Sequence, residues 1–305
     1  MTLTNRDKRK LKKILFYACV VALPVLQFIV FYLMVNINSI ILAFQKYAPR
    51  TLEVSYAGFE NFESVLKKLF TDAGFKTIME NSAVAYVCNL FVGLPLAIIF
   101  SYYIFKQGLW SGLFRTILFI PQIVSSLVLI TSYKIFVDYG VPTIIEALTG
   151  ADVGYLYSDY GSRFGAVLFF NVWAGFGTQV LMYSSAMSNM NMSVIEAAEV
   201  DGVGYFAGLW LIVIPMCFST ISTFIIVGVA GFFTNTLNWF GFEGPHVDTE
   251  FQTFGYYLYQ GIQQNGQNPV AWPELSAFGV VFTSIVAPVT FGVKYLLVKF
   301  GPSCD

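Results

Sequence analysis

Six long apolar segments alternate with polar segments along the chain, and this pattern predicts an all-α membrane protein. Each segment is close to the roughly 20 residues that a helix needs to cross a hydrocarbon core of about 30 Å. None of the six contains Lys, Arg, Asp or Glu. The predicted membrane-spanning segments are residues 14–35, 83–105, 116–133, 164–187, 211–237 and 275–293.

The first apolar segment follows a cluster of basic residues that predicts the orientation of the chain. The segment is longer than the apolar core of a signal peptide and no small-residue cleavage site follows it, so we expect a retained anchor. The positive-inside rule places the N-terminus in the cytoplasm, and six spans return the C-terminus to the same side. The cluster consists of Arg6, Lys8, Arg9, Lys10, Lys12 and Lys13.

The spacing of the apolar segments divides the chain into four parts and leaves two long external loops, 36–82 and 242–274. Residues 58–66 carry apolar side chains near helical spacing, which predicts a short helix on the outer surface. That helix is either an ordinary amphipathic loop helix or a docking element. The four parts are a basic cytoplasmic N-terminus (1–13), the first span with its external loop (14–82), a core of five spans with a cytoplasmic loop at 193–215 (83–293), and a cytoplasmic tail (294–305).

Composition excludes several classes of protein. The chain is 56% hydrophobic and 11% charged, whereas about 25% of the residues of a soluble domain are charged. A net charge of −1 leaves no basic face for nucleic acid. The four cysteines lack Cys-x-x-Cys spacing and the single histidine, His246, has no nitrogen or thiolate ligand nearby, so we expect no metal site.

Residues 193–215 form a polar, acidic, glycine-containing segment between the fourth and fifth apolar segments. Ser193-Val-Ile-Glu196 fits a capping box, which predicts a short helix that starts at Val194. Ala197 and Ala198 keep one part of its surface small, and Gly202 provides the conformation of a tight helix end. Pro215, at the entry to the fifth span, is expected to bend the helix there.

This segment resembles the cytoplasmic coupling loop of ABC importer permeases. The resemblance lies in the spacing of Glu196-Ala197-Ala198, Gly202, Ile212, Ile214 and Pro215. Further residues are similar to the sugar-type branch of these permeases, which includes maltose, glycerol-phosphate and multiple-sugar permeases. They are Asn61-Phe62, Asn81-Ser82, Phe114-Arg115-Thr116, Phe119-Ile-Pro121, Trp173 and Phe300-Gly-Pro-Ser303.

The resemblance implies a type I ABC importer permease fold, with six transmembrane helices and a cytoplasmic coupling helix, in a bacterial cytoplasmic membrane. It also implies separate ATPase subunits that use ATP and Mg, a second permease subunit in a heterodimer, and an extracytoplasmic solute-binding protein. The implied ATPase-coupling residues are Ser193, Glu196, Ala197, Ala198, Asp201, Gly202, Ile212 and Pro215. Two features depart from the family: residues 203–214 hold no basic residue, and Ile214 replaces a commoner leucine.

The chain has no Gly-x-x-x-x-Gly-Lys-Ser/Thr sequence to hold ATP phosphates, so we expect it to bind no cofactor itself. Its apolar segments carry uncharged polar residues that suit a neutral, hydroxyl-rich solute. Such residues also bond between helices as packing contacts, and this alternative stays open for each of them. The candidate solute-path residues are Gln122, Asn171, Gln179, Tyr183, Asn235 and Asn238.

Two other classes compete with an ABC permease. A secondary transporter or another non-ABC polytopic protein would normally show ionisable residues inside its spans or an internal inverted repeat, and the sequence shows neither. A membrane enzyme would need a catalytic set, and neither a Ser-His-Asp nor a Cys-His combination is present. We therefore expect a transport subunit without catalytic residues.

Overall fold

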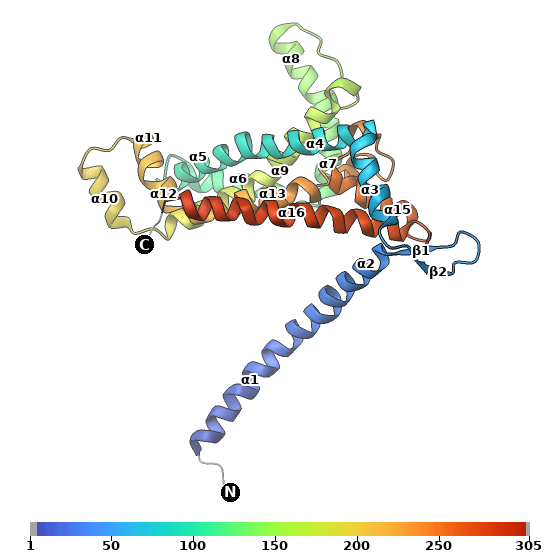
Figure 1. Cartoon of the computed structure of the whole chain (residues 1–305). Helices are drawn as coiled ribbons and strands as arrows, with labels where there is room; N and C mark the ends of the chain where they lie inside the picture. Colours follow the sequence, from blue (N-terminus) through green and yellow to red (C-terminus); the bar gives the residue numbers. More distant parts are fainter. Residues whose placement is uncertain (1–4, 303–305) are drawn as a thin grey trace. The chain divides into compact units, whose positions relative to one another are not determined.

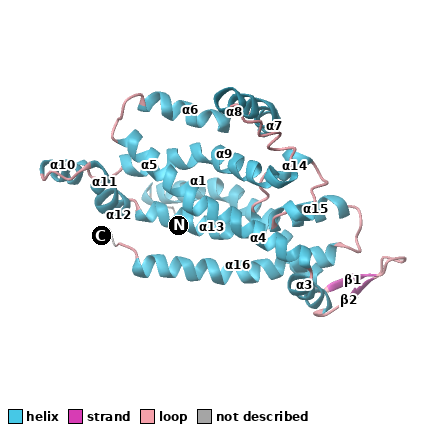
Figure 2. Cartoon of the chain, turned by 90° about the horizontal axis from the view of Figure 1, so that it is seen from above, coloured by secondary structure: helices cyan, strands magenta, loops and turns pink. Residues whose placement is uncertain are grey.

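The computed structural model describes residues 5–302, and its regular elements are helices apart from one two-stranded hairpin (Figures 1 and 2). The predicted all-α class is confirmed. Residues 1–4 of the predicted N-terminal part and residues 303–305 of the predicted tail, including Cys304, lie outside the described residues. Contacts divide the chain into two compact units, Met1–Lys67 with Asn265–Val281 and Lys68–Gln264 with Phe282–Asp305.

The first unit contains a long apolar helix followed by a hairpin. The helix runs through α1 (Asn5–Gln27), the π-helical segment η1 (Phe28–Met34) and α2 (Val35–Ala43). Strands β1 (Gln45–Tyr47) and β2 (Val54–Tyr56) then pair antiparallel, with Lys46 opposite Ser55. The amide nitrogen of Asn61 donates to the carbonyls of Ala43 and Gln45, both over 2.8 Å. Asn61 therefore satisfies one backbone acceptor at the end of α2 and one at the start of β1.

The predicted helix near residues 58–66 is confirmed as α3 (Glu60–Thr71). Val65 is fully buried, whereas Phe59, just before the helix, and Phe70 are 72% and 84% exposed. The helix thus keeps an apolar surface outside the chain's own core.

The second unit contains most of the helices. One continuous run joins α4 (Ala73–Cys88), η2 (Asn89–Gly93) and α5 (Leu94–Phe105). The next elements are α6 (Ser111–Ile123), α7 (Ser126–Ile135), η3 (Phe136–Gly140), α8 (Val141–Thr149), α9 (Tyr160–Ser188) and α10 (Met192–Val200). After them come α11 (Tyr205–Gly208), η4 (Leu209–Val213), α12 (Ile214–Met216), α13 (Phe218–Thr234), α14 (Trp239–Glu243), η5 (Thr249–Phe251), α15 (Phe254–Asn265) and α16 (Trp272–Phe300).

Four of the six predicted spans lie inside long apolar helices. Among the described residues, five helices are long and apolar enough to cross a membrane, or six if the bent pair Tyr205–Met216 and Phe218–Thr234 forms one span. The five helices are Lys12–Ala43, Ala73–Phe105, Ser126–Thr149, Tyr160–Ser188 and Trp272–Phe300. Four of them contain a predicted span: 14–35, 83–105, 164–187 and 275–293, in chain order.

The predicted third span, residues 116–133, is wrong as a single helix. Helix α6 ends at Ile123, and the backbone of Val124 and Ser125 is extended before α7 begins. Pro121 lies in the last turn of α6 and lacks the N–H that would continue the hydrogen-bond ladder. Apolar residues continue on both sides of this break, so the apolar pattern by itself does not mark it.

The predicted fifth span, residues 211–237, is also interrupted. The two helices of the bent pair meet at 73° around Cys217, just after Pro215, so the bend expected near that proline is confirmed. At the other end α13 stops at Thr234, and Leu237 and Asn238 adopt left-handed φ angles of 50° and 55°. Non-helical backbone at membrane depth is tolerated where it is buried in protein or lines a cavity.

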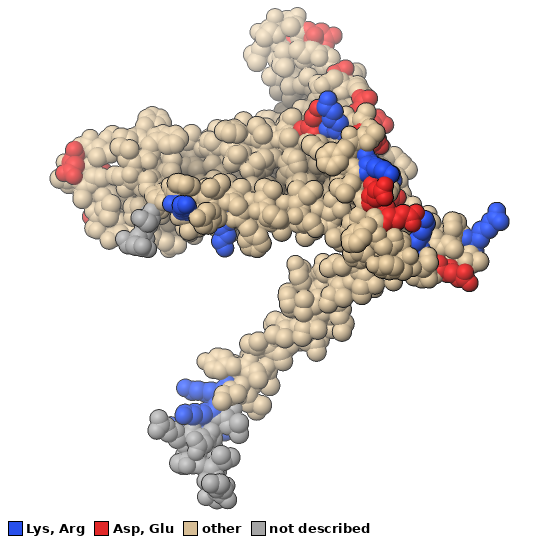
Figure 3. All heavy atoms as spheres, viewed as in Figure 1, with Lys and Arg blue, Asp and Glu red and all other residues tan. Residues whose placement is uncertain are grey.

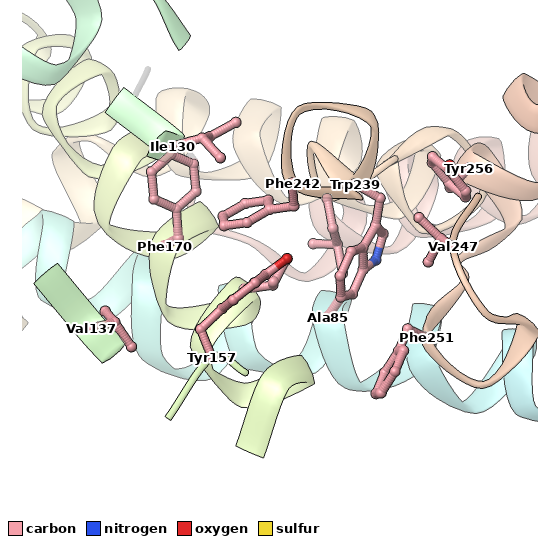
Figure 4. Packing of buried hydrophobic residues seen from close by; sticks show 12 residues of the cluster. Ala85, Ile130, Val137, Tyr157, Phe170, Trp239, Phe242, Val247, Phe251 and Tyr256 are labelled. Atoms are coloured by element: carbon pink, nitrogen blue, oxygen red, sulfur yellow. The ribbon is translucent and has the colours of Figure 1, made fainter. Parts of the chain in front are cut away.

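Two clusters of buried side chains hold the second unit together. The first cluster surrounds Trp239 and includes Tyr157, Phe170, Phe242 and Phe251 (Figure 4). The second joins α5, α9, α10, η4 and α13 and includes Tyr102, Val180, Tyr183, Ile195 and Leu209. Within lipid, contacts of this kind stabilise helix association by close packing rather than by removal of apolar surface from water.

Helix α9 contributes to both clusters, and its contact with α6 depends on a glycine. A Cβ placed on Gly177 would lie 2.0 Å from the carbonyl oxygen of Leu118 in α6. Only glycine allows two backbones to approach so closely.

Candidate functional site

The polar segment at 193–215 folds into helix α10, but its N-cap differs from the prediction. Asn191 is the N-cap: its side-chain oxygen accepts hydrogen bonds from the Ser193 N–H over 3.1 Å and the Ser193 hydroxyl over 2.8 Å. The predicted capping box at Ser193 and the start at Val194 are therefore wrong. Asn and Ser are comparable N-cap residues, and here the asparagine two positions earlier occupies the cap.

The other end of α10 has the glycine turn that the sequence predicts. Gly202 has a φ of +78°, and the N–H of Val203 donates to the carbonyl of Ala198 over 3.0 Å. The N–H of Gly202 also donates to the carbonyl of Glu199 over 3.1 Å. These two bonds with a left-handed residue form a Schellman motif, which fixes the end of the helix.

The faces of α10 are clearly different. Ile195 is 4% exposed and packs into the second buried cluster. Glu196, Ala197 and Asp201 are exposed, and acidic side chains are visible at this end of the second unit (Figure 3). The helix is thus anchored by Ile195, and its outward surface combines these small and acidic residues with the exposed apolar side chains of Met192, Val194 and Val200.

Behind α10 lies a cavity of about 640 Å³ that contacts α5, α11 and η4. Ile212 and Ala198 line it, as do Tyr102 and Tyr205, whose ring centroids are 4.7 Å apart. The ammonium group of Lys106 forms an ion pair with Glu199 at this cavity. Sequence analysis did not predict this pair, because 93 residues separate its members and neither belongs to a spacing pattern.

A second cavity, of about 380 Å³, brings together three of the six candidate solute-path residues. Gln122 comes from α6, Asn171 from α9 and Asn238 from the chain break that follows α13. The amide of Asn171 donates to the carbonyls of Val167 over 2.8 Å and Leu237 over 2.9 Å. Its own oxygen accepts from Asn238 over 2.7 Å, and Gln122 donates to the carbonyl of Ala174.

These amides lie beside both interruptions of the predicted spans. Pro121, Val124 and Ser126 line the same cavity from the α6–α7 break, and Phe170 and Leu129 contribute apolar surface. None of the described residues that line the cavity is charged. The arrangement offers amide groups and the Ser126 hydroxyl, and such groups can bind neutral polyhydroxylated molecules.

The other three candidate path residues lie elsewhere. Asn235 lines a small space of about 70 Å³, and its side-chain oxygen accepts from the Leu237 N–H over 2.9 Å. Tyr183 is fully buried in the second cluster against Phe224, with ring centroids 4.9 Å apart. Gln179 is half-buried on α9 and lines neither of these spaces. For Tyr183, helix packing is the role that its contacts support.

A buried polar network lies close to the first aromatic cluster. Asp138 accepts from the N–H groups of Tyr157 over 2.7 Å and Ser158 over 3.0 Å. The Tyr157 hydroxyl bonds to Glu243, and burial together with this bond raises the pKa of Tyr157 above its usual range. Asp138 lies inside the helix Ser126–Thr149, beyond residue 133, where the predicted third span ends. Its hydrogen bonds anchor the loop before α9.

Comparisons with known proteins find similar sequences among curated transport proteins. No family model matches the chain. Protein LplB of Bacillus subtilis is 26% identical over 281 residues, which cover 86% of this chain and 82% of that protein. The arabinooligosaccharides transport system permease protein AraP of Halalkalibacterium halodurans is 24% identical over 90% of this chain and 85% of its own. The lactose transport system permease protein LacF of Rhizobium radiobacter is 28% identical over 75% of this chain and 77% of its own length.

The fold is similar to that of a solved transporter. A chain in the crystal structure of a bacterial alginate ABC transporter, in complex with an alginate pentasaccharide-bound periplasmic protein, superposes with a TM-score of 0.77. The match covers 98% of this chain and 100% of that chain at 16% sequence identity. Neither comparison supports a secondary transporter or a membrane enzyme.

Proposed function

We propose that this chain, which is a permease subunit of an ABC importer, forms one half of a membrane path for a neutral carbohydrate. It is a transport subunit and not an enzyme. Its partners in this proposal are two ATPase subunits that use ATP and Mg, a second, non-identical permease subunit, and an extracytoplasmic solute-binding protein.

The observation that carries the proposal is helix α10, which is fixed at both ends and directed outward. Its Asn191 cap and Gly202 turn make it a rigid element of nine residues. Exposed Glu196, Ala197 and Asp201 give it a small, acidic surface that can enter a groove of an ATPase with basic groups. Ser193 contributes by its bond to the cap, and Ile212 and Pro215 contribute at the connection to the bundle.

Movement of α10 reaches the membrane helices through a short connection. Three helical elements, α11, η4 and α12, lead from Gly202 to the 73° bend before α13. We infer that closure of the ATPase dimer displaces α10 and that the bundle switches between inward-open and outward-open states by rigid-body motion. The chain break after α13 carries Asn238 at the amide-lined cavity, so the same movement changes that cavity.

The amide-lined cavity favours a neutral solute. Gln122, Asn171 and Asn238 supply amide groups at the cavity, and hydrogen bonds from amides are a usual way to bind sugar hydroxyls. Two of the similar permeases are named for sugars, one for arabinooligosaccharides and one for lactose. The described residues of the lining include no cationic residue that would pair with an anionic sugar.

The proposed location is a bacterial cytoplasmic membrane, in which the chain is a multi-pass protein. We place both termini, together with α10, on the cytoplasmic side, because the basic residues Arg9, Lys10, Lys12 and Lys13 precede the first span and the positive-inside rule applies to such clusters. The hairpin and α3 then face the binding protein.

Site-directed cross-linking tests the docking role of α10. A cysteine at exposed Ala197, in a chain without native cysteines, should cross-link to a copurified ATPase subunit. A cysteine at Leu148, which is 80% exposed on α8, serves as the control and should give no such product. If the Ala197 cysteine failed to cross-link in a complex that contains the ATPase, docking through α10 would be excluded.

A further inference from the structure

We propose that the ion pair between Lys106 and Glu199 is a mechanical link that carries movement of α10 directly to the α4–α5 helix. This link acts in addition to the chain connection through Gly202. The proposal rests on the proposed function of α10 as the helix that contacts the ATPase.

The lysine of the pair is more enclosed than in an ordinary surface ion pair. The Lys106 side chain is 22% exposed and the Glu199 side chain 59% exposed, and the Lys106 ammonium nitrogen lies 5.9 Å from the centroid of the Tyr102 ring. Both members line the cavity behind α10. By contrast, Lys76 and Glu80 lie one turn apart on α4, with side chains 79% and 62% exposed. Reduced solvent contact strengthens the attraction between Lys106 and Glu199 relative to such a pair.

The positions of the two residues on their helices also favour the contact. Glu199 lies in the last turn of α10, where the exposed carbonyl groups repel a carboxylate. Lys106 follows the last residue of α5, where a cation is favourable. The lysine therefore neutralises an acid in an unfavourable place and joins the ends of two helices.

Helix α4–α5 is suited to transmit a displacement. It runs as one helix from Ala73 to Phe105, with a π-helical segment at Asn89–Gly93. Its C-terminal part, α5, packs on α9: the Ser101 hydroxyl donates to the Val180 carbonyl over 3.0 Å, and the ring centroids of Phe100 and Phe176 lie 5.3 Å apart. A push at Lys106 therefore moves a single, laterally supported helix.

The far end of this helix contacts the segment that borders the amide-lined cavity. The Asn81 amide donates to the carbonyls of Glu250 over 2.8 Å and Gln252 over 3.0 Å. The next residue, Thr253, donates to the carbonyl of Asn235 over 2.6 Å. Asn235 begins the chain break that carries Asn238. The contacts thus form a continuous route from Glu199 to the cavity.

Spin labels test the link in the complete complex, reconstituted in lipid nanodiscs with ATPase, second permease and binding protein. Labels at exposed Lys76 and Lys294 report the movement of α4 relative to α16 when ATP and vanadate are added. We expect Glu199→Gln and Lys106→Gln each to reduce the ratio of moved to unmoved complexes about threefold, which lies within the range of coupling for residues in contact. Lys106→Glu combined with Glu199→Lys should restore it. Arg115→Gln, which removes an exposed cation from α6, is the control and should have no effect.

Copurification of the ATPase separates this inference from the proposed function. If the unsubstituted complex did not assemble, or showed no ATP-dependent movement, the proposed function would fail and the link with it. If Glu199→Gln lost the ATPase, Glu199 would be a docking residue and the link would be wrong. The link is also overturned if the ATPase stays bound and either single variant moves normally, or if the reversed pair restores nothing.

Discussion

The side-chain amide of Asn238 donates a hydrogen bond of 2.7 Å to the side-chain oxygen of Asn171. This contact joins the chain break after α13 to the middle of α9, and Asn171 also binds the carbonyl of Leu237 in the same break. Asn171 is thus the residue that holds the break in place at the uncharged cavity. The sequence left two roles open for this residue, helix packing and solute contact. Asn171 bonds to a neighbouring element and also lines the cavity, so its position suits both roles.

Asn171→Leu should destabilise the break and reduce transport. The change removes the partner of the carbonyl of buried Leu237, and an unsatisfied buried polar group costs about 1–3 kcal/mol. The exposed Asn238 amide loses its partner too, but it can bond to water. We expect a lower Tm in detergent and a loss of solute uptake. Thr178→Val, which removes an exposed hydroxyl from the same helix, should change neither. Normal uptake by Asn171→Leu would show that the cavity lies off the solute path.

Gly202→Ala should weaken the turn at the end of α10. Gly202 has a φ of +78° with open space around it, so the effect comes from the backbone alone, about 1–2 kcal/mol for a left-handed residue with a side chain. Reduced copurification of the ATPase, without loss of membrane insertion, is the expected result. Gly204→Ala is the matched control, because Gly204 also has open space but an ordinary φ of −64°. Equal behaviour of the two variants would argue against a special role for the turn.

Gly177→Ala should separate α6 from α9. The added methyl group would lie 2.0 Å from the Leu118 carbonyl oxygen, and overpacking of this kind costs about 1–3 kcal/mol. Differential scanning fluorimetry of the purified chain should show a clear decrease in Tm. Gly165→Ala changes the same helix where no atom lies within 4 Å, and it should leave the Tm unchanged. A tolerated Gly177→Ala would mean that the two helices are not in close contact.

Asp159 should make the stability of the chain depend on pH in the acid range. It caps α9, and hydrogen bonds from the Ser162 side chain and backbone lower the pKa of its carboxyl. Because the folded-state pKa is lowered, the stabilisation is present above the unfolded pKa of about 3.9 and is lost as pH falls through the folded-state pKa. Asp159→Asn keeps a capping oxygen but does not titrate. Between about pH 5 and pH 3, a range that includes the unfolded pKa of Asp, the Tm of the variant should therefore decrease less than the Tm of the unsubstituted chain. Identical pH profiles would show that the cap stays protonated or makes no contribution.

The sequence predicts the long helices well because lipid imposes a simple requirement on them. Helices α9 and α16 begin and end within a few residues of segments 164–187 and 275–293, apart from the C-terminal end of α16, which continues to Phe300. The continuous apolar runs hide the breaks at Val124 and after Thr234, since nothing in an apolar pattern marks where backbone leaves a helix to line a cavity.

Local choices and long-range contacts account for the remaining differences. Asn191 and Ser193 are both good N-cap residues two positions apart, and only the three-dimensional structure distinguishes them. The grouping of Gln122 with Asn171 and Asn238, and the exclusion of Tyr183 from that cavity, depend on how three distant elements pack. The Gly202 turn, by contrast, could be predicted because few residues other than glycine adopt its conformation.

The central claim is tested most directly by ATP-dependent uptake in proteoliposomes. The chain is reconstituted with its ATPase, second permease and binding protein, and a panel of radiolabelled neutral oligosaccharides and their uronate counterparts is supplied outside. Uptake of a neutral member that requires internal ATP and Mg, and that no ion gradient replaces, is the predicted result. Uptake driven by a proton or sodium gradient without ATP would contradict the account.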